Sequence, residues 1–362
     1  MEKGNRLFVD IHAIQSLPPS NVNRDDTGSP KTAIYGGVRR ARVSSQSWKR
    51  AIRQYFNTES GNDVGIRSLN VVKYISDLIL SKNSSLTADD ALSMADKVFN
   101  GAGVKTKDKK TKALFFLGKK QAEQLAEAAL NNVDNPSELK KILSANPSVD
   151  IALFGRMVAD DPSLNEDASV QVAHAISTHE VQTEFDFYTA MDDLAPEDNA
   201  GAGMLGTVEF NSSTLYRYAN IAVHDLLRQL KTSDQTVSAS KLFIEAFANS
   251  MPTGKSNTFA NLTIPHLLMV NIRRNRPVNL VTAFENPVKS YAGNSRGHSV
   301  NSIEKLFAEV KKTEKFVHMP LSTFYLVNEE VAKPEWGTEE TSLISLLNDF
   351  EEVVTNCIQG RN

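Results

Sequence analysis

Two hydrophobic periodicities alternate along the chain, and together they predict an α+β protein. Residues 7–14 alternate and are rich in β-forming side chains, so we expect a strand there that ends at Pro18. A second strand is expected at residues 38–43. The serines that follow, beginning with Ser44, can cap a helix in which Trp48 and its neighbours at helical spacing form a buried side.

The middle of the chain, residues 68–148, changes to helical patterns of mixed polarity. The expected helices cover residues 71–80, 87–99, 119–131 and 136–145. We interpret this stretch as a helical subdomain inserted after the first strand–helix unit. Its lysine-rich part, residues 104–120, is expected to be a mobile loop.

A β-type pattern returns in the second half. Residues 181–191 and 206–221 are rich in β-formers, and the segment between them holds glycine, alanine and acids. This arrangement predicts a long β-hairpin arm with a flexible tip. Beyond the arm we expect helices at 221–230 and 238–251, a strand at 267–272 and an acidic amphipathic helix at 341–357.

The composition is that of a globular protein. The chain has 362 residues, of which 41% are hydrophobic, and this is enough to bury a full core. The single cysteine, Cys357, excludes a disulfide framework and points to a reducing compartment. No signal peptide is evident, and no apolar run approaches the roughly 20 residues of a membrane span. We therefore expect a cytoplasmic protein that does not bind a membrane.

Positive charge is concentrated, although the formal net charge is only −3. Residues 27–58 hold seven lysines and arginines and no acid, and residues 104–120 hold seven lysines and one aspartate. The balancing acids lie at Asp192, Asp193, Glu197, Asp198 and in residues 339–352. Segregation of this kind can present a basic face to a nucleic acid despite a negative total.

The segment 38–53 carries the clearest physical signal for such a face. Its positive side chains are Arg39, Arg40, Arg42, Lys49, Arg50 and Arg53. A basic strand that leads into a basic helix can offer charged donors to successive phosphates. The alternative is a solvated charged surface, but such surfaces usually interleave both signs of charge.

The triplet Gly254-Lys255-Ser256 is similar to the end of a phosphate-binding loop. The full motif needs a glycine five positions before Gly254, where this chain has Asn249. We therefore do not expect nucleotide hydrolysis.

Two other groups of residues allow a catalytic interpretation. His174 and His179 are not spaced as a helical zinc pair, so we expect hydrogen-bonded histidines and no metal or cofactor. Asp25 and Asp26 lie beside an arginine and could hold a divalent ion for phosphodiester cleavage, but turn formation explains them more simply.

Several stretches of the sequence resemble the signatures of CasC, the Cascade backbone family of type I-E CRISPR systems. The similar stretches follow in order over nearly the whole chain: NRDD at 23–26, AIYGG at 33–37, RVSSQSWKRA at 42–51, VDIALFGRM at 149–157, AHAISTH at 173–179 and residues 210–221 with YRYAN at 216–220. Trp48 departs from the family, which usually has a smaller aliphatic side chain there, and residues 160–169 diverge.

The resemblance implies a hand-like architecture and a non-enzymatic role. A palm of the RNA-recognition-motif (ferredoxin-like) type would comprise residues 1–56 and 215–362, helical fingers residues 57–180, and a β-hairpin thumb residues 181–214. Family members line up head to tail along the CRISPR RNA, and each thumb kinks the RNA. The implied partners are CRISPR RNA, target DNA, further copies of the chain and other Cascade subunits, in antiviral defence.

The resemblance also implies site residues. Contacts to the RNA backbone are expected from Arg24, Lys31, Arg42, Ser44, Gln46, Lys49, Arg50 and Arg53. The wedge that displaces a base at each kink is expected from Met157, Tyr188 and Thr189. The lysines expected to face DNA are Lys105, Lys107, Lys109, Lys110 and Lys112.

Two alternatives remain open from the sequence. The chain could be a metal-dependent endoribonuclease that uses Asp25 or Asp26, or a single-strand RNA-binding protein unrelated to CRISPR. If the chain is a Cascade backbone subunit, the acidic segments near the thumb and the C-terminus could pair with basic palms of neighbouring copies.

Overall fold

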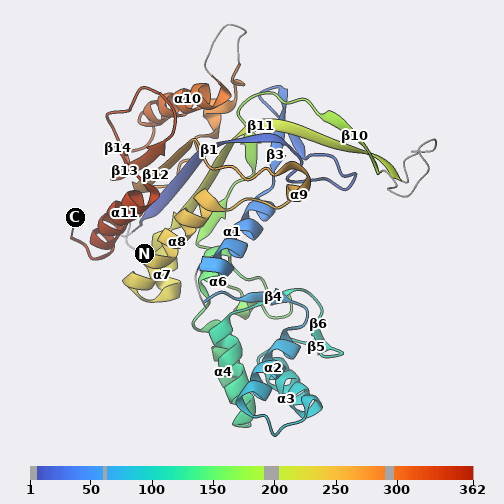
Figure 1. Ribbon diagram of the computed structural model, residues 1–362. Helices are drawn as coiled ribbons and strands as arrows, with labels where there is room; N and C mark the ends of the chain where they lie inside the picture. Colours follow the sequence, from blue (N-terminus) through green and yellow to red (C-terminus); the bar gives the residue numbers. More distant parts are fainter. Residues whose placement is uncertain (1–5, 60–62, 191–203, 290–296, 362) are drawn as a thin grey trace, which may run out of the picture.

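The computed structural model describes residues 6–59, 63–190, 204–289 and 297–361 and has a mixed α+β fold, as the hydrophobic pattern predicts. One large sheet forms the body. A two-stranded arm projects from one end of the sheet, and a separate group of helices lies below it (Figure 1). Among the described residues, no helix is both long enough and apolar enough to cross a membrane.

The sheet is built around β1 (Phe8–Ser20), which pairs antiparallel with β11 (Met204–Ala222) and with β12 (Leu267–Arg273). The strand order is β14-β13-β12-β1-β11-β9-β3-β2, and β8 and β10 also pair with β11. The remaining bounds are β2 Thr32–Tyr35, β3 Val38–Val43, β8 Val170–Val172, β9 Ala175–Ser177, β10 Glu184–Ala190, β13 Ser322–Val327 and β14 Thr338–Glu339.

The first strand is longer than predicted. It does not end at Pro18 but continues to Ser20, and its register against β11 shifts between Leu17 and Ser20. Proline has no N–H group to donate, and strands accept it where the ladder is irregular. The prolines therefore mark an irregular register within the strand and not its end.

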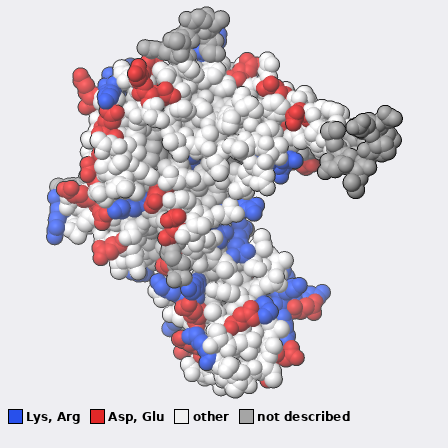
Figure 2. All heavy atoms as spheres, in the orientation of Figure 1, with Lys and Arg blue, Asp and Glu red and all other residues white. Residues whose placement is uncertain are grey.

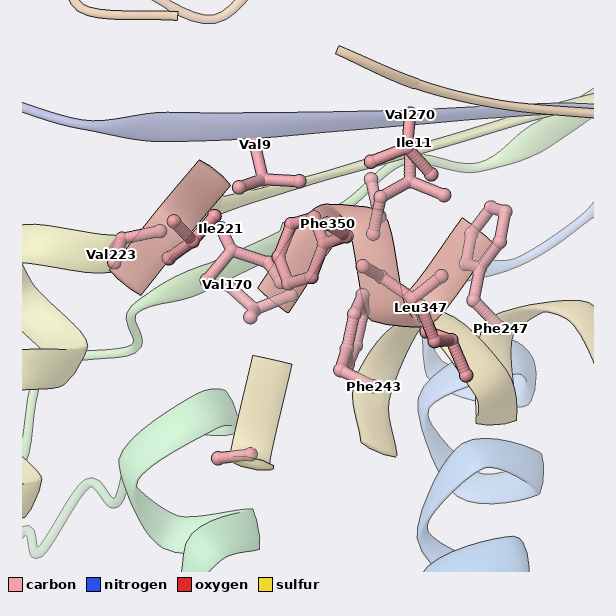
Figure 3. Packing of buried hydrophobic residues seen from close by; sticks show 14 of the residues in the cluster. Val9, Ile11, Val170, Ile221, Val223, Phe243, Phe247, Val270, Leu347 and Phe350 are labelled. Carbon is pink, nitrogen blue, oxygen red and sulfur yellow. The ribbon is translucent and has the colours of Figure 1, made fainter. Parts of the chain in front are cut away.

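Helices cover both faces of the sheet. Because side chains alternate along a strand, Val9 and Ile11 of β1 pack on one face with Phe243, Phe247 and Phe350 (Figure 3). The helices on that face are α1 Ser45–Glu59, α7 Val223–Leu230, α8 Ser233–Asn249 and α11 Leu343–Ile358. The opposite face packs against α10 (His298–Thr313). Two buried faces explain why β1 is almost wholly buried.

A second hydrophobic core lies below the sheet, within residues 66–164. It is formed by α2 Val71–Lys82, α3 Ala88–Gly101, α4 Lys119–Leu130, α5 Pro136–Ser144 and the strand pair β4 Ile66–Ser68 and β7 Phe115–Leu117. The four helices predicted here are confirmed to within two residues at each end. α6 (Val149–Phe154) connects this core with the sheet.

The prediction of a loop at residues 104–120 is wrong in part. β5 (Thr106–Lys107) and β6 (Lys110–Thr111) form a small hairpin, and β7 follows it. Asp108 and Lys109 make the two-residue turn with φ of 51° and 58°, the left-handed values that tight hairpins require. The hydrophobic pattern of so short a hairpin is too weak to be seen in the sequence.

The arm consists of β10 and the first part of β11, paired antiparallel from Glu184↔Phe210 to Ala190↔Met204. The predicted hairpin is confirmed for these residues. The expected tip, together with Asp192, Asp193, Glu197 and Asp198, lies outside the described residues.

Buried polar side chains form a network on the α10 face of the sheet. Asp10 accepts hydrogen bonds from the Tyr218 hydroxyl at 2.7 Å and the Val278 N–H at 3.0 Å, and the Arg273 guanidinium lies 3.1 Å away. Burial raises the pKa of Asp10 to about 6, although its partners oppose this rise. His12 bonds to Tyr216 at 2.9 Å, and burial lowers the pKa of His12 to about 3.

These two groups are expected to give the folded chain opposite pH dependences. Between about pH 4 and 6 the unfolded chain binds a proton on His12 that the folded chain does not, so His12 makes stability rise with pH. Folded Asp10 binds a proton that the unfolded chain lacks, so Asp10 makes stability fall with pH. In urea titrations from pH 4 to 6, Asp10→Asn should make the slope of unfolding free energy against pH more positive. His12→Asn should make it more negative. Each change amounts to at most about 1.4 kcal/mol per pH unit.

The slope is the informative quantity here, because both substitutions also remove hydrogen bonds and lower stability at every pH. Parallel curves for the two variants and the unmodified chain would contradict the assignment.

Candidate nucleic-acid interface

The junction of β3 and α1 fixes the first part of the interface. Ser44 accepts the first helical hydrogen bonds through its carbonyl, from Ser47 at 3.0 Å and Trp48 at 3.2 Å. Its own N–H donates to Asn23 Oδ1 at 2.8 Å. This bond ties the β1–β2 loop, which we define as residues 21–31, to the start of α1. Arg24 of the loop is thereby held beside α1.

The other end of the β1–β2 loop is tied to the arm. Asn21 donates from Nδ2 to the carbonyls of Gly28 at 3.0 Å and Glu209 at 2.8 Å. Glu209 belongs to the part of β11 that pairs with β10. The loop therefore bridges α1 and the base of the arm.

Two polar cavities, of about 430 and 660 Å³, lie along this bridge and share Arg24, Thr253 and Lys255. Arg50 of α1 lines the smaller cavity, and Tyr188 of the arm lines the larger one. We call the two cavities together the groove. Of the predicted RNA-binding residues, the structure brings Arg24, Arg50 and Tyr188 together at this groove.

The two faces of the arm differ. Tyr188 lines the larger cavity, and its ring crosses Gly206, where a Cβ atom would lie 2.4 Å from the tyrosine hydroxyl oxygen. Phe185, Phe187 and Leu205 are each exposed by more than 60%, and alternation along the strands places them on the opposite face. The predicted wedge residue Thr189 is exposed on that opposite face.

The outer side of α1 carries the predicted contacts Gln46, Lys49 and Arg50. Gln46 and Arg50 are exposed and four residues apart, so they share one face of the helix. Lys49 is half-buried, with Nζ 5.8 Å from the centre of the Phe154 ring, and burial lowers the pKa of Lys49. The face of an aromatic ring attracts an ammonium group, so this contact helps to hold the Lys49 side chain in place.

Arg53 has a different environment from its neighbours on α1. Its Nε lies 3.1 Å from the buried Asp150 carboxylate, its NH2 donates to the Gly65 carbonyl at 3.2 Å, and its guanidinium lies 4.3 Å above the Phe116 ring. Asp150 also accepts hydrogen bonds from Ser148 at 2.6 Å and from Gly65 at 2.9 Å. These contacts connect α1 to the second core.

The arginines of β3 are not equivalent. The expectation that Arg40 faces RNA is wrong, because the side chain is buried and donates to the carbonyls of Ser177 at 2.9 Å and Phe284 at 2.8 Å. Arg42 remains partly exposed. It donates from Nε to the Thr32 carbonyl at 3.2 Å and contacts His174 Nδ1 at 3.1 Å.

The remaining predicted residues are placed as follows. Lys31 is half-buried beside Arg42, with its N–H bonded to the Asn23 carbonyl at 2.8 Å. Met157 follows α6 and is 85% exposed. The five lysines expected to face DNA lie on or beside the β5–β6 hairpin, and four of them are exposed: Lys105, Lys107, Lys110 and Lys112.

The histidines and Trp48 have structural partners. His179 accepts the Thr214 N–H at 3.0 Å, so the expectation of hydrogen-bonded histidines is confirmed for His174 and His179. Trp48 is buried, and the Arg217 guanidinium lies 3.7 Å from its ring centre. The large ring thus shields a buried cation.

Asp25 is directed into its own loop. Its Oδ1 accepts hydrogen bonds from the Thr27 hydroxyl at 2.7 Å and from the Thr27 and Ser29 N–H groups at 3.0 Å each. These bonds lower the pKa of Asp25. Within the described ranges, no three histidine, cysteine or acidic side chains are grouped so that they could hold a metal ion.

The space-filling view shows lysine and arginine side chains gathered below the arm, where the sheet meets the helices of the second core (Figure 2). The charge segregation noted in the sequence therefore becomes a localised basic surface beside the groove.

The fold is similar to those of solved structures over nearly the whole chain. One chain, described as "CRISPR RNA-guided surveillance complex, pre-nicking", is similar with a TM-score of 0.83 and 31% identity, over 96% of this chain and 100% of that one. Another, described as "CRISPR RNA-guided surveillance complex", has a TM-score of 0.74 and 27% identity, over 96% of this chain and 99% of that one.

The family model described as CT1975-like protein matches residues 9–352, and the chain belongs to this family. No curated protein sequence matches the chain.

Proposed function

We propose that the chain is a guide-RNA-binding backbone subunit of a CRISPR surveillance complex of type I-E. Residues 1–56 and 215–362 would be the RNA-recognition-motif-like palm, residues 57–180 the fingers and residues 181–214 the thumb. Copies would follow one another along the guide RNA and present its bases for pairing with target DNA. The CT1975-like family and both similar structures support the part of this proposal that places the chain in a CRISPR surveillance complex.

The observation that carries the proposal is the convergence of Arg24 and Arg50 with Tyr188 at one groove. Guanidinium groups bind phosphates of any sequence, and an aromatic ring stacks on any base. A subunit that must accept every spacer needs contacts of this kind, because base edges have to stay free for pairing.

Two finer parts of the proposal concern base displacement at the kinks and the β5–β6 hairpin. Met157, together with Tyr188 and Thr189 on a neighbouring copy, would displace one base at each kink, at an unstacking cost of about a few kcal/mol. The exposed lysines of the β5–β6 hairpin would attract the target DNA backbone.

A non-catalytic role fits the site better than metal-dependent cleavage. Catalytic carboxylates are held free to bind an ion or a water, whereas Asp25 directs one oxygen into three hydrogen bonds of its own loop. Those bonds shape the loop that carries Arg24.

The proposal is tested by co-expressing the tagged chain with a CRISPR array and the other subunits of a surveillance complex. We expect a particle of several copies per RNA, measured by native mass spectrometry, in which sequencing finds nuclease-protected guide RNA. An RNA-free monomer in the presence of all subunits would overturn the proposal. Protected RNA of random cellular sequence would favour a general single-strand RNA-binding protein.

A further inference from the structure

One wall of the groove is formed by a loop with unusual backbone geometry. Residues 252–260, which we call the 252–260 loop, contain the short helix α9 (Ser256–Phe259). Lys255 precedes this helix with φ of 51°, and Ala260 follows it with φ of 47°. Left-handed conformations of non-glycine residues are costly, and they cluster where a side chain must take a particular position for binding.

The 252–260 loop is anchored on both sides of Lys255. Gly254 lies against the β1–β2 loop so closely that a Cβ atom on it would be 2.2 Å from the Val22 carbonyl oxygen. On the other side, Phe259 packs against Phe210 at the base of the arm, with ring centres 5.9 Å apart. The lysine is therefore held at a defined point between the β1–β2 loop and the arm.

Lys255, the residue with the strained backbone, brings a positive charge to both cavities of the groove. Lys255 is exposed, and it lines both cavities together with Arg24, while Arg50 lines the smaller one. Among the residues that the structure describes, none of these three cations is in a salt bridge. Asp25 also lines the smaller cavity, and its Oδ1 accepts hydrogen bonds from Thr27 and Ser29 of its own loop. The smaller cavity is thus lined by three cations and one acid, and such a net positive lining favours an anion.

We propose that the smaller cavity of the groove is a phosphate subsite for the RNA backbone, in which Lys255 binds the phosphate together with Arg24 and Arg50. This inference rests on the proposed RNA-binding function and adds to it a contact from a segment about 200 residues further along the chain than the basic strand and helix. A nucleotide-hydrolysing site is not implied, because Asn249 replaces the first glycine of that motif.

A glycine substitution separates binding from folding at this position. Glycine adopts left-handed backbone without strain, so Lys255→Gly should unfold at the same temperature as the unmodified chain or higher. The same variant should bind single-stranded RNA about tenfold more weakly at 0.15 M salt. Loss of one phosphate contact should also lower the slope of log K against log salt by about 0.7.

The measurement is fluorescence anisotropy of the full chain with labelled 30-nucleotide oligo(U) and a mixed-sequence RNA of the same length, from 0.05 to 0.3 M KCl. Lys255→Arg keeps the charge and should retain most of the affinity, and Lys315→Ala is the control for loss of an exposed lysine elsewhere. The losses should be equal for both RNAs, because a phosphate contact does not depend on sequence.

The outcomes distinguish this inference from the function it rests on. If the unmodified chain binds neither RNA, the proposed function fails, and the subsite fails with it. If the unmodified chain binds both RNAs and Lys255→Gly shows the same affinity and salt slope, only the phosphate subsite is overturned. A loss confined to one RNA sequence would also overturn it, because the contact would then involve a base.

Discussion

Simultaneous reversal of charge at Lys49 and Arg50 is expected to lower the affinity of the chain for single-stranded RNA by about 100-fold or more. Each side chain offers charged donors on the outer side of α1, and a charge-assisted hydrogen bond contributes about 1.5–3 kcal/mol. The loss of two contacts and the gain of two repelling carboxylates should therefore raise the dissociation constant for RNA by a factor of more than about 100. The affinity of Lys49→Glu/Arg50→Glu is measured by anisotropy at 0.1 M salt.

The matched control for this variant is Lys311→Glu/Lys315→Glu, which changes the net charge equally at the end of α10. Both control side chains are exposed. A general charge effect would weaken RNA binding in both variants, and this outcome would contradict a specific interface at α1. Circular dichroism of both proteins would confirm that the substitutions leave the fold intact.

Two neighbouring arginines of α1 are expected to respond in opposite ways to replacement by alanine. Arg53→Ala leaves the buried Asp150 carboxylate without its cation, and breaking such a pair costs about 3 kcal/mol. Arg50→Ala removes an exposed side chain, so the unfolding free energy should change by less than about 0.5 kcal/mol. For RNA affinity the order reverses, with a loss of about tenfold for Arg50→Ala and a smaller loss for Arg53→Ala.

The pH dependence provides an internal check on the Arg53→Ala result. Burial already raises the pKa of Asp150, and loss of the arginine removes a charge that lowers it. The stability difference from the unmodified chain should therefore be larger at pH 7 than at pH 5, where protonation begins to remove the unpaired charge. Equal stability of the Arg50→Ala and Arg53→Ala proteins in urea would show that the Asp150 contact contributes little.

Helices and strands with a regular hydrophobic period could be predicted, because that period can be seen within a short stretch of sequence. The strand at Val38–Val43 and the four helices of the second core follow from patterns of a few turns with ordinary caps, such as Thr87 before α3. Hairpins of two-residue strands have no comparable pattern, which is why β5 and β6 were not expected. The register of the first strand beyond Leu17 depends on its pairing with β11, so the local sequence does not predict it either.

The environment of each arginine could not be predicted, because it depends on distant segments. Arg40 is buried and donates to carbonyls that follow it by 137 and 244 residues, whereas Arg53 is half-buried and pairs with a carboxylate 97 residues away. The local sequence has no acidic residue near either arginine, so it does not reveal that both make structural contacts. Lys255 is the opposite case. The sequence offered it only as part of an incomplete nucleotide-binding motif, and the fold brings it to the groove.

The position of β1 in the sheet also determines the order in which the chain can fold during synthesis. This strand leaves the ribosome well before its partners, which are Ala222 to Asn211 of β11 and Arg273 to Leu267 of β12 and are made about 200 and 260 residues later. At about 5–20 residues per second, the wait is of the order of 10–50 s. The second core is complete once residue 164 has emerged, so it can fold during this interval. A nascent chain therefore carries an unpaired, apolar strand beside a finished helical unit, and it is in this interval that a chaperone is needed most.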